Sequence, residues 1–222
     1  MKNMSKEQGF TLIEMIGVLA VIAILVALLL PKVFEIMAES RANALVAAVR
    51  TYETAVVDYY SDISSLLPLD VGGTPAAEAT GDSATAISLG ARLTLDANDA
   101  LNTGANSWVR FRGPYLAKFI TNVPPGLGTQ VFMPTSSTPV AYNDPATVSN
   151  IGWDLNNDGN SDIPSNSNVV YVYFSGISDA DFDKVDAILD PGIGATTAER
   201  VVRGRAKYDA ATDQMMIYLN HG

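Results

Sequence analysis

Residues 9–30 read GFTLIEMIGVLAVIAILVALLL, and this stretch decides how the chain is organised. From Phe10 to Leu30 it holds 21 residues, of which only Glu14 carries a side-chain charge. As a helix rising about 1.5 Å per residue, the segment is about 31 Å long and matches the hydrocarbon core of a bilayer. We therefore expect residues 10–30 to form a transmembrane helix. Its carboxylate is costly in lipid unless it finds a partner, so Glu14 is a candidate functional residue.

The nine residues before this helix form a short polar leader, MKNMSKEQG. Lys2 and Lys6 place the leader on the cytoplasmic side of a membrane, because positive residues favour that side. A secretory signal has a shorter apolar region and then small residues for cleavage, whereas here the run ends in Leu28-Leu29-Leu30-Pro31-Lys32. Secretory cleavage is not expected, and the domain after the helix faces outward.

Composition excludes several function classes. The formal net charge of −10 repels nucleic acid, so no nucleic-acid partner is expected. There is no cysteine, which excludes disulfides, thiol nucleophiles and cysteine-ligated metals. The one histidine, His221, lies next to the C-terminus, where a general base is poorly held. The chain is not expected to be an enzyme.

The string Gly9-Phe-Thr-Leu-Ile-Glu14, with a basic leader before it and 16 uncharged residues after it, resembles the prepilin family. This family comprises type IV pilins and the pseudopilins of type II secretion, and the resemblance covers about the first 60 residues. It implies that a prepilin peptidase cuts between Gly9 and Phe10 and that the new amino group of Phe10 is N-methylated. It also implies that the apolar helices leave the membrane, through an inner-membrane assembly platform, and pack into a filament of copies or related pilins.

Glu14 has a physical role in that arrangement. Cleavage creates a cationic amine at Phe10, and each charge in an apolar filament core needs an opposite one. A Glu14 carboxylate bonded to the Phe10 amine of a neighbouring subunit satisfies both and fixes the axial register. The alternative is that Glu14 sits at headgroup level in a simple anchor, which leaves Gly9 and Phe10 unexplained.

After the apolar run the periodicity changes. From residue 31 to 61, apolar residues such as Phe34, Leu45, Tyr52 and Tyr59 recur three and four positions apart, which predicts an amphipathic continuation of the same helix. Pro31 should kink or loosen the helix where the two parts join. Many family members place a helix-kinking proline there.

Residues 62–222 are expected to form a globular head. Residues 62–106 show little periodicity and predict a long connector with one short element within 84–95, and the resemblance to pilins implies that this connector varies between members. Strands are expected at 130–133, 140–142 and 169–174, a helix capped by Ser178 precedes the stop Pro191-Gly192, and residues 200–208 and 214–219 form a hairpin. The predicted fold is α+β: a long N-terminal helix against a small antiparallel sheet, similar to pilins.

An acidic loop between Trp153 and Pro164 has the spacing of a calcium-binding loop. Oxygen side chains stand at loop positions 1, 3, 5 and 9, and Gly159 stands at position 6. Position 12 is Ser165 instead of a bidentate glutamate, so calcium affinity should be modest. A metal-free turn rich in asparagine and aspartate remains the other reading. The candidate calcium ligands are Asp154, Asn156, Asp158, Asn160 and Asp162.

Three classes of function compete. The first is a subunit of a type IV pilus-like filament, with the secretion pseudopilin as its alternative. Such a subunit sits in the inner membrane before assembly and in an extracellular or periplasmic filament afterwards. The second is a membrane-tethered, calcium-dependent adhesive module, which has no N-methylated Phe10 and forms no filament. The third, an exported enzyme, lacks a catalytic constellation.

Overall fold

A computed structural model describes about two thirds of the chain. It covers residues 10–69, 89–96, 109–119, 127–128, 130–132, 135–136, 153–163, 167, 169–194, 196, 199 and 203–222. The chain divides into two compact units, Met1–Ser40 and Arg41–Gly222.

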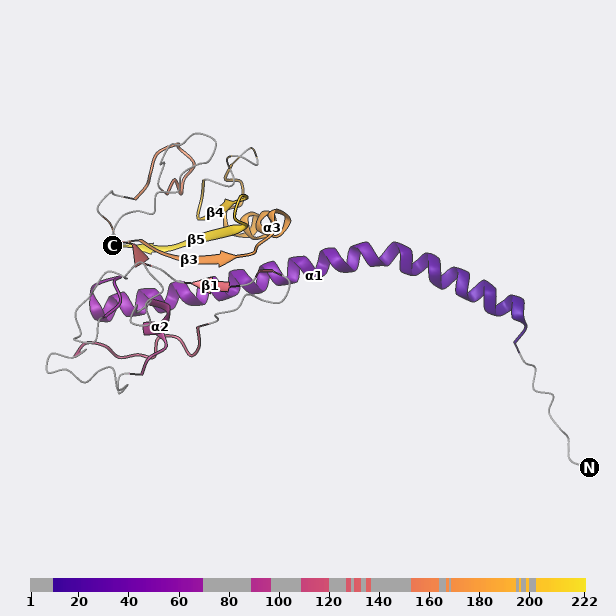
Figure 1. Ribbon diagram of the computed structural model, residues 1–222, viewed down its shortest axis with the longest axis horizontal. Helices are drawn as coiled ribbons and strands as arrows, with labels where there is room; N and C mark the ends of the chain where they lie inside the picture. The colour runs from indigo at the N-terminus through magenta and orange to yellow at the C-terminus, as the bar shows by residue number, and fades with distance from the viewer. Residues whose placement is uncertain are drawn as a thin grey trace, which may run out of the picture. The chain divides into compact units, whose positions relative to one another are not determined.

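Helix α1 runs without interruption from Leu12 to Ile63, 52 residues, and passes through Pro31 (Figure 1). The expected continuation to residue 61 is confirmed, and the helix extends two residues further. Burial begins only at Ala42, although apolar residues start at the helix N-terminus. The buried positions recur at helical spacing along one stripe: Ala42, Leu45, Val46, Val49, Tyr52, Ala55, Val56 and Tyr59.

The second unit contains an antiparallel sheet. Its strands are β1 (Gln130–Phe132), β2 (Thr135–Ser136), β3 (Val169–Ser175), β4 (Ala206–Asp209) and β5 (Gln214–His221). The spatial order is β1-β3-β5-β4, and β2 also pairs with β3. The central pair, β3 and β5, aligns Val172 with Ile217 and has a register shift between Val170 and Tyr171. Strand β4 pairs antiparallel with β5, which confirms the predicted hairpin, although its first strand begins at Ala206 and not at residue 200.

Alternation along the strands gives the sheet two distinct faces. Val170, Val172 and Phe174 of β3 join the main core with the buried stripe of α1. Val169 belongs instead to a second cluster with Trp153 and Ile163, which covers the opposite face. In Figure 1, β3 and β5 run alongside the C-terminal part of α1. The α+β, pilin-like arrangement expected from the sequence is thus observed.

Helix α3 (Asp179–Leu189) begins as predicted. Ser178 is its N-cap: the hydroxyl accepts a hydrogen bond from the Asp181 backbone N–H at 3.2 Å and donates to the Asp181 carboxylate at 2.7 Å. Phe182 and Val185 face the main core. The chain turns after the helix at Gly192, whose φ of +85° suits glycine.

The short element expected within residues 84–95 is helix α2 (Leu89–Leu93). Its last carbonyl, from Leu93, accepts hydrogen bonds from the N–H groups of Tyr115 and Leu116, both at 2.9 Å. The strand expected at 140–142 and most of the connector at 62–106 lie outside the described residues.

Candidate functional site

The start of α1 is a reciprocal cap made by Thr11 and Glu14. The Glu14 carboxylate accepts hydrogen bonds from the Thr11 backbone N–H at 2.8 Å and from the Thr11 hydroxyl at 2.7 Å. The Thr11 hydroxyl in turn accepts from the Glu14 N–H at 3.4 Å. This is the capping-box pattern, in which the cap residue and the third helical residue satisfy each other. The T-x-x-E spacing of residues 11–14 is the sequence signal of this cap, and it indicates a role for Thr11 beside that of Glu14.

Phe10 precedes this cap and is 83% exposed. It therefore lies one residue before the cap and within about one helical turn of Glu14. Gly9, on the other side of the expected cleavage point, lies outside the described residues. Of the three residues expected from the sequence to take part in processing and assembly, the structure therefore places two, Phe10 and Glu14, at the N-terminus of α1.

The helix that follows exposes its apolar side chains on all sides. Every residue from Phe10 to Leu30 is exposed, including Leu12 and Leu28. By length and composition, α1 is able to cross a membrane. The first charged side chains after the apolar run are Lys32 and Glu35, whose charged groups lie 2.6 Å apart. This segment can be surrounded by lipid or by other helices, and Glu14 is its one charged group.

The acidic loop folds around its own side chains. The two oxygens of Asp154 accept hydrogen bonds from the N–H groups of Asp158 at 3.1 Å and Gly159 at 2.9 Å. The Asp158 carboxylate accepts from the Asn160 N–H at 2.8 Å, and this bond is the main cause that keeps the pKa of the Asp158 carboxyl below its usual range. Gly159 has a φ of +88°, a value that few other residues adopt. The predicted alternation of oxygen side chains therefore builds a compact turn.

The side-chain amide of Asn156 lies between the carboxylates of Asp158 and Asp162. Nδ2 of Asn156 donates to Asp162 at 2.9 Å and to Asp158 at 3.3 Å. The same Asp162 also accepts the backbone N–H of Leu155 at 2.7 Å. Two carboxylates thus face one electropositive donor. The side chains of the set carry carboxylate and amide oxygens, which are the ligands that calcium prefers.

The buried end of the loop carries its own positive partners. Asp154 is fully buried, and the Arg203 guanidinium lies 3.8 Å from its carboxylate. Arg203 also donates to the Asn157 side chain at 2.6 Å. Lys207 of β4 is fully buried, with its ammonium 5.0 Å from the centre of the Trp153 ring. Burial lowers the pKa of Lys207 to about 8, although the nearby Asp154 carboxylate opposes the shift.

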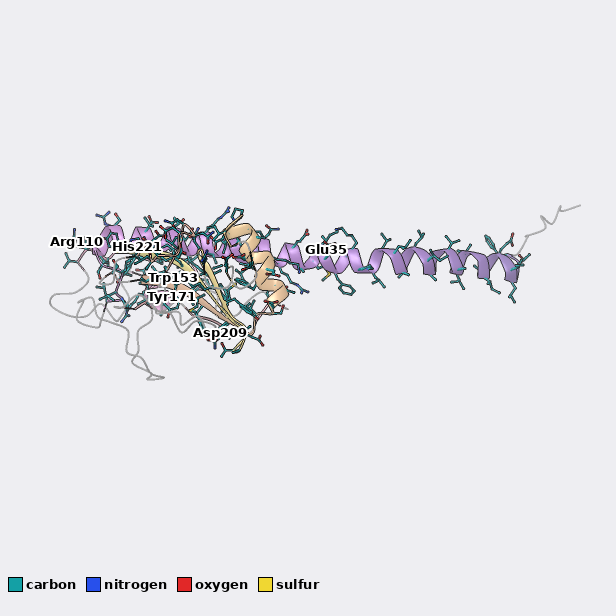
Figure 2. All side chains as sticks on the ribbon, turned by 90° about the horizontal axis from the view of Figure 1, so that it is seen from above. Glu35, Arg110, Trp153, Tyr171, Asp209 and His221 are labelled. Atoms are coloured by element: carbon teal, nitrogen blue, oxygen red, sulfur yellow. The ribbon has the colours of Figure 1, made fainter. Side chains whose placement is uncertain are left out.

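Figure 2 shows Trp153 and Tyr171 close together on the sheet, with Asp209 at the end of β4. The Trp153 and Tyr218 ring centres are 5.6 Å apart, so aromatic side chains fix the loop to the sheet. Within the described ranges, no group of three or more histidine, cysteine, aspartate or glutamate side chains has the geometry to hold a metal ion. The Asp154 carboxylate faces Arg203. The Asp158 and Asp162 carboxylates accept hydrogen bonds from the Asn156 amide, and Asp158 also accepts one from the Asn160 amide. Ser165, at loop position 12, lies outside the described residues.

Comparison with known proteins identifies the N-terminal segment. Residues 4–30 match the prokaryotic N-terminal methylation motif, the prepilin-type signal of type IV pilins and pseudopilins. No curated protein and no solved structure matches the chain significantly. The match includes Gly9 and also Phe10, Thr11 and Glu14 at the start of α1.

Proposed function

We propose that this chain, which carries the prepilin-type signal, is a structural subunit of a type IV pilus-like filament. The observation that supports this most strongly is the methylation motif at residues 4–30, followed by an apolar helix exposed on all sides. In this proposal prepilin peptidase cuts between Gly9 and Phe10, and the Phe10 amine is N-methylated. The role is structural and involves no catalysis by the chain itself.

Glu14 sets the register between subunits in this proposal. Before assembly, its carboxylate is satisfied by the Thr11 N–H and hydroxyl of its own chain. During assembly, the carboxylate accepts the Phe10 amine of a neighbouring subunit, which pairs two charges that are costly in an apolar core. The Phe10 amine and the Glu14 carboxylate lie on the same short stretch of the chain, so the contact repeats identically from subunit to subunit.

Before assembly the subunit spans the inner membrane with its globular domain outside, because Lys2 and Lys6 keep the leader on the cytoplasmic side. An inner-membrane assembly platform then moves it into an extracellular or periplasmic filament of copies or related pilins. A secretion pseudopilin uses the same steps at Gly9, Phe10 and Glu14. Neighbouring genes discriminate: a retraction ATPase indicates a pilus, and a set of type II secretion partners indicates a pseudopilus.

Mass spectrometry of the mature N-terminus tests the proposal directly. We expect a chain that begins at an N-methylated Phe10, found in material sheared from the cell surface or in the periplasm. A mature chain that still begins at Met1 would contradict processing and favour a membrane-tethered module. Glu14→Ala should leave cleavage intact while reducing incorporation into filaments.

We also propose that the acidic loop binds calcium with modest affinity. Support comes from the convergence of Asp158 and Asp162 on one electropositive donor, Nδ2 of Asn156, whose place a cation would take while the amide turned its oxygen toward it. Asp154, Asn156, Asp158, Asn160 and Asp162 would supply the oxygen ligands. Bound calcium would then cross-link the loop, a role that disulfides fill in many pilins and that this cysteine-free chain leaves open.

Asn156→Asp separates the calcium-binding reading from the metal-free turn. It removes the donor between two carboxylates and adds a third negative charge, so the chain without calcium should melt at a lower temperature. Millimolar calcium should raise the melting temperature of the wild-type chain and raise that of Asn156→Asp further, whereas Asp158→Ala should show no rise. A wild-type melting temperature that calcium does not change would contradict the proposal.

A further inference from the structure

The end of strand β5 holds an asparagine side chain against the backbone of the next residue. Oδ1 of Asn220 accepts a hydrogen bond from the backbone N–H of His221 at 2.8 Å. Because Oδ1 is about 1.2 Å from its carbonyl carbon Cγ, this bond places the His221 nitrogen about 3 to 3.5 Å from Cγ. At that separation a nucleophile and the carbon that it attacks are already in a near-attack arrangement.

A β-bulge lies directly before Asn220. Val170 of β3 pairs with Asn220, whereas the next residue, Tyr171, pairs with Tyr218. Leu219 is therefore the extra residue of β5, and the backbone around it departs from the regular extended form. In a regular strand the side chains stand roughly perpendicular to the sheet while the N–H groups lie within it, which keeps a side chain from the next N–H. The bulge removes this obstacle at Asn220.

His221 supplies an accessible amide and a base beside it. His221 is exposed and Asn220 is partly exposed, so water reaches the pair. The imidazole Nδ1 lies 2.6 Å from the Tyr218 hydroxyl, and this hydrogen bond holds the ring at the end of the strand. Histidine is the side chain that most often transfers protons near neutral pH. The amide that loses a proton when a ring closes on Cγ thus belongs to the residue that carries the imidazole.

We propose that Asn220 is a site of spontaneous deamidation through a cyclic imide formed with the backbone of His221. The His221 nitrogen forms a bond to Cγ of Asn220, the bond from Cγ to Nδ2 breaks, and the amide proton leaves with Nδ2 as ammonia. Water then opens the five-membered imide at one of its two carbonyl groups. Opening at Cγ leaves an aspartate in the normal linkage, and opening at the main-chain carbonyl leaves an isoaspartate. Water is the one other reactant, and the site is independent of the proposed filament function.

Both products change the end of the sheet. Each adds a negative charge at position 220, and the isoaspartate also lengthens the main chain by one carbon. The longer chain displaces His221 from its pairing with Val169 and from its hydrogen bond with Tyr218. Since the Tyr218 ring packs on Trp153, the change extends to the aromatic side chains that fix the acidic loop to the sheet. The modified fraction rises with the age of the chain, so this end of the sheet records that age.

A single tryptic peptide reports on the site. Cleavage after Lys207 releases residues 208–222, in which Asn220 is the one asparagine. The full-length chain in detergent is incubated at neutral pH, in one sample folded and in a parallel sample unfolded in guanidinium, and is then digested and measured by mass spectrometry. Deamidation raises the mass of the peptide by about one dalton. Incubation in heavy-oxygen water adds about two more, because solvent opens the imide, and fragmentation places the change at Asn220.

We expect conversion to be at least about threefold faster in the folded chain than in the unfolded chain, because folding holds the reacting atoms together. An equal or lower rate in the folded chain overturns the inference, since the strand then protects the side chain. His221→Pro removes the attacking N–H and should abolish the mass change, whereas the control His221→Ala retains the N–H and should still be converted. Conversion of His221→Pro at the wild-type rate, or loss of conversion in both variants, also overturns the inference.

Discussion

The apolar segment at residues 10–30 and the globular unit Arg41–Gly222 differ in where they place apolar and charged side chains. In the helix, leucine and isoleucine side chains are exposed, and the one charge, Glu14, is satisfied by Thr11 within the same turn. In the globular unit, most of the described large apolar side chains are buried, and Lys207 is buried with them, beside Trp153. The described part of the globular unit covers most of its apolar side chains itself, whereas the apolar helix is covered only in lipid or among other helices.

The largest expected effect is on the free energy of unfolding, and it is measured with one matched leucine substitution in each of the two regions. Leu45 is 1% exposed and Leu25 is 53% exposed, although both lie on α1. Leu45→Ala should lower the free energy of unfolding of the globular unit by about 2–5 kcal/mol, because it removes buried contacts and leaves a cavity. Leu25→Ala should change it by less than about 0.5 kcal/mol. Urea unfolding of the detergent-solubilised chain, followed by near-ultraviolet circular dichroism, measures both.

Equal losses for Leu45→Ala and Leu25→Ala would contradict the comparison. They would mean that the apolar helix contributes to the stability of the globular unit. The expected difference also bears on the proposed function, since a helix that is unnecessary for folding is available for membrane insertion and assembly.

The buried charge of the globular unit predicts a pH dependence of stability. The pKa of Lys207 is lowered by burial to about 8 from an ordinary 10.5, so the folded chain releases this proton before the unfolded chain does. Between these two values the unfolded chain binds more protons, and the free energy of unfolding therefore rises with pH. From pH 7 to 9.5 the rise should be about 2 kcal/mol, measured by urea unfolding. Above about pH 10 it should reverse, because burial raises the pKa of Tyr208 to about 12.

Lys207→Met is the control for this effect. It keeps the apolar stem of the side chain and removes the ionisable group, so the rise between pH 7 and 9.5 should disappear. A wild-type chain whose stability stays flat over this interval would show that Lys207 remains charged in the folded state, held by Trp153 and Asp154.

How much the sequence could predict differs between the two regions for a physical reason. The helix, its carboxylate and the cap of α3 depend on residues close together in the sequence, and periodicity is enough to find them. The partners of the acidic loop are distant in the sequence. Asp154 contacts Arg203, which is 49 positions further along the chain. Lys207 contacts the Trp153 ring only because the loop folds onto the sheet. Alternation along β4 places Lys207 on the face away from α1, and it does not show that Trp153 covers this face.

The third expected effect distinguishes the charge of Glu14 from its hydrogen bonds. Glu14→Gln keeps an acceptor for the Thr11 N–H and hydroxyl, whereas Glu14→Ala removes it. If pairing with the Phe10 amine sets the register, both substitutions should lower the yield of sheared filaments by about tenfold, which corresponds to about 1.4 kcal/mol. A Glu14→Gln chain that assembles normally would show that the cap, and not the charge, is what assembly needs.

The smallest expected effect concerns Thr11, whose hydroxyl both caps α1 and holds the Glu14 carboxylate. Thr11→Val keeps the shape of the side chain and removes these bonds, while Thr11→Ser retains the hydroxyl. Because the Glu14 carboxylate can still accept the Thr11 backbone N–H, we expect Thr11→Val to lower filament yield only about threefold, a change of about 0.6 kcal/mol. Thr11→Ser should assemble like the wild type. A lower yield would support a role of the Thr11 hydroxyl in orienting Glu14 toward the Phe10 amine, whereas a higher yield would contradict it and mean that the Thr11 contact competes with that amine for Glu14.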